Sequence, residues 1–164
     1  MDNSRWIQDA VQTYQARLTR YAAQIIGDPE RGRDVAQETF FRLCRQPRAE
    51  VENHVAAWLF TVCRRLALDV RRKEQRMQTL TAEQSAAQLS REGSQVELTE
   101  QTDLAQKVLQ LVEKLSENQR EVVRLKFQNG LSYREISQIT QLSIGNVGYL
   151  LHTAMRTLRE WLEP

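Results

Sequence analysis

The C-terminal third of the chain, residues 115–159, carries start and stop signals for three helices separated by tight turns. The segments 116–119 and 132–135 are capping boxes, in which a Ser is followed three residues later by Gln or Glu. Asn129-Gly130 lies between them, and such a pair commonly ends a helix. These signals predict a first helix that ends at this pair and a second helix that begins shortly after it.

The second and third of these helices have the relative lengths of a helix-turn-helix. The second is short, from Tyr133 to about Ile139, and Leu131 just before it is placed to pack on Ile136. Ser143 can cap a longer third helix. Its apolar residues at helical spacing are Val147, Leu150, Leu151, Ala154 and Leu158. This arrangement is the geometry that lays one helix in the DNA major groove, and a plain helical hairpin is the alternative.

The composition favours an all-α protein. The 164 residues include only three prolines and six glycines, and their number allows one or two small domains. No apolar run approaches the roughly 20 residues of a membrane span. The first residues also lack the apolar core of a signal peptide. We therefore expect no membrane insertion and a cytoplasmic location.

The cysteines and histidines predict no metal centre. Cys44 and Cys63 each lie within an apolar helical pattern, which predicts two free, buried thiols in a reducing compartment. Together with His54 and His152 they match no zinc spacing, so we expect neither a metal nor another cofactor. The chain also offers no nucleophile–base pairing and no glycine-rich phosphate loop, and an enzyme is therefore the least favoured class.

Charge is distributed unevenly along the chain. Residues 1–80 carry 14 Lys/Arg against 10 Asp/Glu (+4), residues 81–104 carry 1 against 5 (−4), and residues 105–164 carry 8 against 6 (+2). The acidic middle segment is rich in Gln, Ser and Thr and poor in large apolar residues. These changes in net charge and composition along the chain predict two small helical domains, 1–80 and 105–164, joined by a linker at 81–104. A solvated helix is the alternative for the middle segment.

We expect three helices and a short turn in the N-terminal block. The helices span about Ser4 to Ile26, Pro29 to Gln46 and Asn53 to Arg76, with the turn at residues 49–52. Asp28 and Asn53 are the expected caps. The residues expected to face inward are Trp6, Val11, Tyr14, Leu18, Tyr21 and Ile25 in the first helix and Trp58, Leu59, Val62, Leu66 and Val70 in the third. The apolar residues of the second helix are Val35, Phe40, Phe41 and Leu43.

One face of the second helix mixes carboxylates, an amide and an aromatic ring. Asp34, Gln37, Glu38 and Phe41 fall at spacings of three, four and seven residues, which places them on one side. A polar face with one large ring suits contact with a basic helix of a partner protein. The alternative is a solvated face with Phe41 tucked into the core.

The third helix ends in a dense run of positive charge. Its six basic residues are Arg64, Arg65, Arg71, Arg72, Lys73 and Arg76, and Asp69 and Glu74 are the only acids among them. Arg71 follows Arg64 by seven residues, and Arg72 follows Arg65 by seven, so these side chains stack along one side of the helix. The run has the form of a phosphate-binding stripe, and an ordinary solvated face is the alternative.

Three segments, in this order, resemble bacterial sigma factors. Residues 34–43, DVAQETFFRL, resemble the helix with which that family binds RNA polymerase. Residues 58–69, WLFTVCRRLALD, with the basic residues after them, resemble the segment that opens the minus-ten promoter element. Residues 115–123, LSENQREVV, and 130–136, GLSYREI, resemble the domain that binds the minus-thirty-five element. Order and length are similar to those of the compact extracytoplasmic-function (ECF) type, which keeps two domains and a linker.

The resemblance implies a function and a set of roles. The chain would bind core RNA polymerase, recognise promoter DNA and direct transcription initiation, with an anti-sigma factor as a further partner. The polymerase-binding residues would be Asp34, Gln37, Glu38, Phe41 and Arg42. The residues at the minus-ten element would be Arg64, Arg65, Asp69, Arg71, Arg72 and Lys73. The residues at the minus-thirty-five element would be Arg134, Ser143, Asn146, Tyr149, His152 and Arg156.

The sequence departs from the family pattern in both DNA-binding segments. Many members have Asn where this chain has Arg65, which puts base reading there in doubt. Members commonly carry Lys, Ser and Arg after the Val that matches Val147, and another Arg one turn later. This chain has Gly148, Tyr149, Leu150 and Thr153 at those positions. The change leaves three interpretations: Asn146 and Tyr149 read an unusual promoter, the domain binds weakly and relies on the polymerase, or Tyr149 and Leu150 form a protein contact such as one with an anti-sigma factor. Our hypothesis combines the first two.

Two other classes of protein also fit the motifs. A stand-alone helix-turn-helix regulator would use the N-terminal block for dimerisation or sensing and would bind a palindromic duplex without polymerase. A sigma-like adaptor with weakened DNA reading would bind polymerase without opening a promoter.

Overall fold

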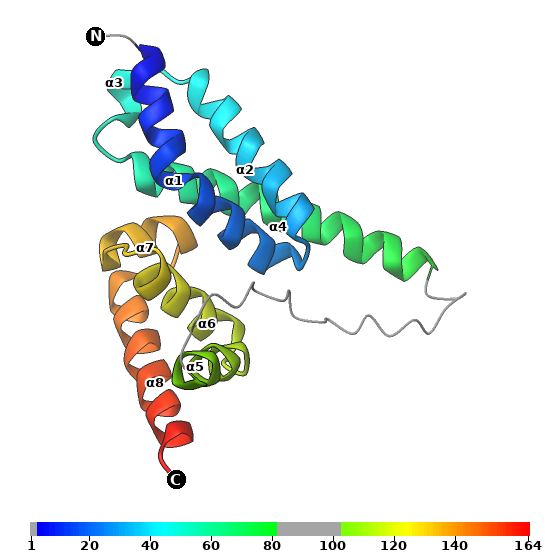
Figure 1. Ribbon diagram of the computed structural model, residues 1–164, viewed down its shortest axis with the longest axis vertical. Helices are drawn as coiled ribbons and strands as arrows, with labels where there is room; N and C mark the ends of the chain where they lie inside the picture. Colours follow the sequence, from blue (N-terminus) through cyan, green and yellow to red (C-terminus); the bar gives the residue numbers. More distant parts are fainter. Residues whose placement is uncertain (1–2, 82–102) are drawn as a thin grey trace. The chain divides into compact units, whose positions relative to one another are not determined.

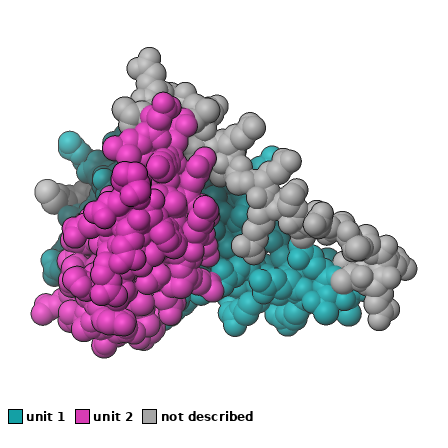
Figure 2. All heavy atoms as spheres, turned by 90° about the horizontal axis from the view of Figure 1, so that it is seen from below, with its two compact units in different colours: residues 1–95 teal, residues 96–164 magenta. Residues whose placement is uncertain are grey.

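The computed structural model describes residues 3–81 and 103–164, and the secondary structure of these residues is entirely helical. The chain divides into two compact units, residues 1–95 and 96–164, coloured separately in Figure 2. The all-α class predicted from composition is therefore confirmed. Most of the segment 81–104, predicted to be a linker, lies outside the described residues. Within the described ranges, no helix has both the length and the apolar character needed to cross a membrane.

Unit 1 is a helical hairpin with a long helix packed across it (Figure 1). Its elements are α1 Asn3–Ile26, α2 Pro29–Cys44, α3 Arg48–Val51 and α4 Val55–Thr81. Gly27 ends α1 in the left-handed region, at φ +84°, where a glycine meets no Cβ penalty. Asp28 then caps α2 as predicted, accepting a 2.9 Å hydrogen bond from the Glu30 N–H, and Pro29 is the first helical residue.

The core of unit 1 lies where α4 meets α1 and α2. The Tyr21 and Phe60 rings, from α1 and α4, lie 5.4 Å apart between centroids and are inclined at 60°. Leu18, Leu43 and Leu59 are fully buried around them. Tyr21 and Leu18 were predicted to face inward, and both do.

The two cysteines differ in environment. Cys63 is buried, and its thiol donates to the Leu18 carbonyl at 3.6 Å. Burial raises the pKa of Cys63 to about 12, with a smaller opposing effect from Thr39, so the thiol stays neutral. Cys44 is exposed, so the prediction of two buried thiols was wrong for this residue. It is the last residue of α2, and it points away from the core into which its neighbour Leu43 is buried.

The start and the buried side of α4 differ from the prediction. The helix begins at Val55, and the His54 carbonyl accepts the first helical hydrogen bond from Trp58, so the cap position is one residue beyond Asn53. The fully buried residues of α4 are Ala57, Leu59, Phe60, Cys63 and Ala67. The predicted stripe shares only Leu59 with this set, and its other four members, Trp58, Val62, Leu66 and Val70, are half-buried. Three of the buried residues, Ala57, Cys63 and Ala67, are small, which suits a helix that packs against both α1 and α2.

Between residues 103 and 164, unit 2 folds into four α-helices and one π turn, and the α-helices are labelled in Figure 1. Its elements are α5 Asp103–Glu113, α6 Glu117–Val123, η1 Arg124–Gln128, α7 Tyr133–Thr140 and α8 Ile144–Leu162. Both predicted capping boxes are present, and their Ser hydroxyls accept from Gln119 N–H at 3.4 Å and from Glu135 N–H at 3.1 Å. The Ser143 hydroxyl accepts from Asn146 N–H at 3.0 Å, so the predicted start of α8 is confirmed.

The turn between α7 and α8 is tied together by local hydrogen bonds. Gln141 is in the left-handed conformation, at φ 64°, and ends α7. The Thr140 hydroxyl donates to the Ile136 carbonyl at 2.7 Å and accepts from Leu142 N–H at 3.3 Å. Ser137 donates to the Leu142 carbonyl at 2.5 Å. These bonds satisfy polar groups inside the turn, so the angle between the two helices is held by side chains as well as by packing.

The buried side of α8 completes the core of unit 2. Val147, Leu151, Ala154 and Leu158 are buried as predicted, whereas Leu150 is only half-buried. On the flank of this stripe, the Gln119 amide of α6 donates to the Thr153 hydroxyl at 3.2 Å. The rotation of α8 about its axis is therefore set by both apolar burial and a hydrogen bond.

Helix α5 and the π turn were not predicted from the sequence. The first has an apolar pattern that could have revealed it, with Leu104, Val108, Leu111 and Val112 at spacings of four, three and one. In the second, the Asn129 N–H donates to the Arg124 carbonyl at 3.2 Å, five residues back. Arg124 is buried and pairs with Glu113 of α5, and burial lowers the pKa of its guanidinium.

Alanine substitutions at two helical glycines should change stability in opposite directions. A Cβ at Gly32 would lie 2.7 Å from the backbone nitrogen of Ala23, so Gly32→Ala should lower the free energy of unfolding by about 1–3 kcal/mol. A Cβ at Gly148 would lie 3.6 Å from the Tyr133 ring, an ordinary contact. Gly148→Ala should therefore raise the free energy of unfolding by about 0.5–1 kcal/mol. Urea unfolding followed by circular dichroism measures both, and changes of the same sign would contradict this packing.

Candidate nucleic-acid interface

The outward face of α2 carries the first candidate surface. Asp34, Gln37 and Phe41 are exposed and Glu38 is half-buried, whereas the opposite face of the helix lies in the core. Phe41 is 60% exposed, so the alternative that tucks this ring into the core is wrong. Arg42 donates through Nε to Glu38 at 3.2 Å, one turn back. An exposed ring beside carboxylates is a feature of contact surfaces, because it stabilises the free chain little.

The basic side of α4 forms the second candidate surface. Arg65, Arg72, Lys73 and Arg76 are exposed, whereas Arg64 and Arg71 are half-buried. The Arg72 guanidinium pairs with the Asp69 carboxylate on the same helix. A shallow, open depression on this part of the helix is lined by Arg72, Gln75, Arg76 and Thr79. Gln75 and Thr79 were not predicted as site residues, although their positions relative to Arg72 place them on its face of the helix.

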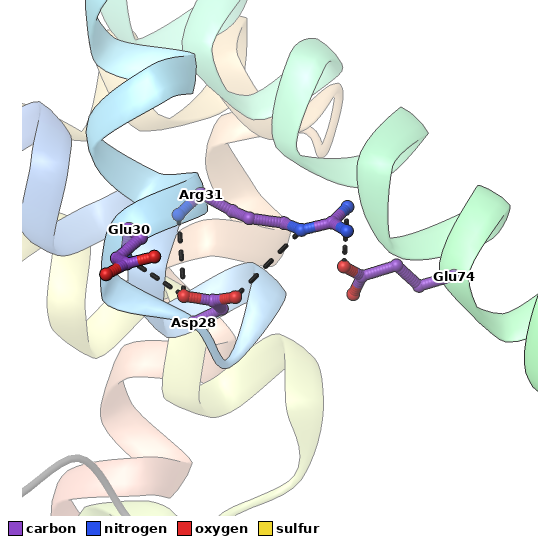
Figure 3. Close-up of polar contacts among 4 residues, drawn as sticks. All are labelled: Asp28, Glu30, Arg31 and Glu74. Carbon is purple, nitrogen blue, oxygen red and sulfur yellow. Dashed lines mark hydrogen bonds and ion pairs between the residues drawn. The ribbon is translucent and has the colours of Figure 1, made fainter.

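An ion pair between helices anchors the basic end of α4. Figure 3 shows Arg31 of α2 reaching Glu74 of α4, with a separation of 2.7 Å between Nη1 and Oε1. Asp28 lies on the other side of Arg31 and accepts from the backbone N–H groups of Glu30 and Arg31 at 2.9 and 3.5 Å. Because Arg31 is shared between two carboxylates, the cap of α2 is connected to the end of α4.

The exposed side of α8 carries the third candidate surface. Ser143, Asn146, Tyr149, His152 and Arg156 are all exposed there, and Tyr149 is 65% exposed. Arg134 is exposed near the start of α7. The buried stripe of α8 points away from these side chains, so Asn146, Tyr149, His152 and Arg156 share the outer side of the helix. The first two turns of α8 contain no Lys or Arg.

The predicted site residues thus form separate surfaces on α2, α4 and α8. Each surface comes from one helix, with Arg134 of α7 near the third. Among residues 3–81 and 103–164, no group of three or more His, Cys, Asp or Glu is placed to hold a metal ion. The chemistry that these surfaces offer is binding, through exposed rings, amides and cations.

Two regions of the chain match families of known proteins. Residues 10–77 match Sigma-70 region 2, and residues 105–158 match Sigma-70, region 4. The chain belongs to the sigma-70 family. The first match covers α2 and nearly all of α4, and the second covers the helix-turn-helix.

Curated relatives place this sigma-70 family chain in the ECF type. It is 29% identical over 150 residues to the ECF RNA polymerase sigma factor SigL of Mycobacterium tuberculosis, covering 90% of this chain and 84% of the relative. It is 24% identical over 163 residues to the ECF RNA polymerase sigma factor SigW of Bacillus subtilis, covering 94% and 87%.

A solved structure shares the fold of this ECF-type chain. It is the sigma factor RpoE in complex with the anti-sigma factor NepR from Bartonella quintana, with a TM-score of 0.67 and 21% identity. The similarity covers 94% of this chain and 95% of that one.

The pairing of Asp69 with Arg72 leads to a testable prediction about the α4 surface. Asp69→Asn removes the carboxylate that neutralises Arg72, so the full chain should bind single-stranded DNA more tightly. The slope of log K against log salt should steepen by about 0.7, the value for one added contact between the protein and a phosphate. Lys73→Gln should make the slope shallower by a similar amount. A salt titration with a fluorescent oligonucleotide measures both changes.

Glu50→Gln provides a matched control for that titration. Glu50 is an exposed acid on α3, so its substitution changes the net charge equally but away from the stripe. We expect it to leave the salt slope within error of the parent chain. Weaker binding by Asp69→Asn would contradict the neutralising role and would indicate that the Asp69 carboxylate itself contacts DNA.

Proposed function

We propose that this chain is a sigma factor that binds core RNA polymerase through the α2 surface and opens promoters through the α4 surface. The observation that carries the proposal is the match of regions 2 and 4, in family order, to segments that bear these exposed surfaces. Residues 1–80 would bind polymerase and the minus-ten element, and residues 105–164 the minus-thirty-five element, with 81–104 as linker. The protein would act in the cytoplasm and would perform no catalytic step, because the polymerase carries out synthesis.

The α2 surface suits a basic helix of the polymerase. Asp34 and Glu38 supply negative charge, Gln37 supplies an amide, and Phe41 supplies a ring that would be desolvated on binding. Arg42 is already paired with Glu38, so it would hold that carboxylate in place. Charge would guide the encounter, and the ring would contribute most of the affinity.

The α4 surface suits a melted strand. Arg65, Arg72 and Lys73 present exposed cations to phosphates, and Arg64 and Arg71 lie half-buried beside them. Unstacked bases bind to aromatic and apolar surfaces, and the half-buried Trp58 lies on the same helix. Capture of a strand by such a surface favours melting without any chemical step, because it lowers the free energy of the opened DNA.

A second candidate function is a sigma-like adaptor with weakened DNA reading. The observation that favours it is the absence of Lys and Arg from residues 144–155 of α8. An anti-sigma factor is proposed as a further partner, since the structural relative from Bartonella quintana was solved in complex with one. A stand-alone regulator is disfavoured, because it would not require the region 2 match.

Run-off transcription tests the proposal directly. Core polymerase from the source organism is supplied with a pool of random promoters, with and without the full chain. We expect chain-dependent transcripts that share two upstream elements. Binding to core polymerase without such transcripts would favour the adaptor, and absence of polymerase binding would contradict both functions.

The exposed ring on α2 provides a test of polymerase binding. Phe41→Ala should change the free energy of unfolding by less than about 0.5 kcal/mol, because the ring is mostly in solvent. It should weaken binding to core polymerase about five- to thirtyfold, since a desolvated aromatic anchor contributes about 1–2 kcal/mol. Fluorescence competition with a labelled parent chain measures the affinity.

Leu80→Ala is the matched control for the Phe41 variant. Leu80 is 83% exposed near the end of α4, so its substitution also removes an exposed apolar side chain from unit 1. We expect its affinity for core polymerase to equal that of the parent. Equal affinities for all three proteins would show that polymerase does not cover Phe41.

A further inference from the structure

The outer side of the first two turns of α8 is formed chiefly by two exposed side chains, with the half-buried Leu150 beside them. Asn146 and Tyr149 are exposed there, and Val147 between them is buried. Gly145 has no side chain, and a Cβ built on it would meet nothing within 4 Å. Ile144 is also half exposed, but it precedes Asn146 by two residues and so lies on the opposite side of the helix. The helix backbone beside Asn146 can therefore come close to a surface inserted against it.

This part of the helix lacks the usual reader of guanine. Arginine bound to O6 and N7 of guanine is the commonest specific contact in the major groove. The first Arg of α8 is Arg156, ten residues after Asn146, which corresponds to about 15 Å along the helix axis. The N-terminal residues of a recognition helix are the ones that contact base edges. Arg156 therefore lies too far along α8 to share base pairs with Asn146.

The two side chains that are present match the edges of A·T pairs. An Asn amide can donate to N7 and accept from N6 of adenine in the same plane, and an apolar or aromatic side chain packs on the thymine methyl group. Residues three apart on a helix have Cβ atoms about 5–6 Å apart, which spans one to two base-pair steps of about 3.4 Å. Asn146 and Tyr149 can thus contact neighbouring or next-neighbouring base pairs.

We propose that α8 reads A·T pairs in the upstream promoter element, with Asn146 on an adenine and the Tyr149 ring on a thymine methyl group. The inference rests on the proposed sigma-factor function, and it names the class of DNA sequence that the third surface selects. Gly145 contributes by leaving the helix backbone bare, so that the short Asn146 side chain reaches the base edges. The hydrogen bond from Asn146 N–H to Ser143 fixes the start of the helix that carries both readers.

The first part of the test identifies the upstream element. The full chain is assembled with core polymerase and presented with DNA duplexes randomised over the upstream region. We expect the bound duplexes to be dominated by A·T pairs at the positions protected by α8. Dominance of G·C pairs at those positions in a complex that transcribes would overturn the base-reading inference alone. A chain that fails to assemble with polymerase would contradict the proposed function instead.

The second part changes one chemical group of one base at a time in the selected DNA and leaves the protein unchanged. Deoxyuridine in place of thymidine removes only the methyl group and should weaken binding about fourfold at the base that Tyr149 contacts. In 7-deazaadenine the N7 acceptor is lost, and the substitution should weaken binding roughly five- to hundredfold at the base that Asn146 contacts. Parent-chain binding that is insensitive to both analogues would overturn the inference.

Variants assign each analogue effect to one side chain. Tyr149→Ala should abolish sensitivity to deoxyuridine but keep sensitivity to 7-deazaadenine, and Asn146→Ala should do the reverse. Phe127→Ala is the matched control, because Phe127 is an aromatic residue of the same unit with 60% exposure, close to the 65% of Tyr149. It should retain both sensitivities. Retention of deoxyuridine sensitivity by Tyr149→Ala would overturn the assignment of that ring.

Discussion

The packing of α4 against the α1–α2 hairpin is the constraint on which the rest of unit 1 depends. The Tyr21 and Phe60 rings and the bond from Cys63 to the Leu18 carbonyl fix the rotation of α4 about its own axis. Once that rotation is set, most of the basic side chains of α4 face outward, because a helix has one buried side, whereas Arg64 and Arg71 stay half-buried. The same burial of Leu43 turns Phe41 of α2 into solvent. Two candidate surfaces therefore follow from one core.

Features that depend on a few neighbouring residues could be predicted from the sequence, whereas features that depend on packing could not. The caps at Asp28, Ser132 and Ser143 are local hydrogen-bonding patterns, and all three were predicted correctly. The exposed faces of α2 and α8 also followed from helical spacing. The buried side of α4 was misjudged, because apolar residues lie around much of its circumference and only its partners decide which are covered. The ion pair of Arg31 with Glu74 joins residues far apart in the sequence, and no local pattern reveals it.

Unit 2 separates the burial that holds α8 from the residues that can contact DNA. Val147, Leu151 and Ala154 fix the helix in the core, and the turn at Gln141 sets its direction without involving the outer face. The outer face is therefore free to change without loss of the fold. A face with few cations contributes little nonspecific affinity, since that affinity comes mainly from neutralised phosphates. Such a domain would bind usefully only when a second contact, such as polymerase, raises its effective concentration at the promoter.

In unit 1, carboxylates within the basic run of α4 limit nonspecific affinity for DNA in a similar way. Asp69 and Glu74 each pair with an arginine, one on α4 and one on α2, so the acids lower the net positive charge of the helix. Sequence selectivity is a difference between affinities, and a lower background affinity for any phosphate chain increases that difference. If this stripe binds DNA as proposed, the acids would also hold its side chains in place beforehand and so reduce the entropy lost on binding. A stripe of cations alone would bind more tightly to all DNA and would discriminate less between promoters and the rest of the genome.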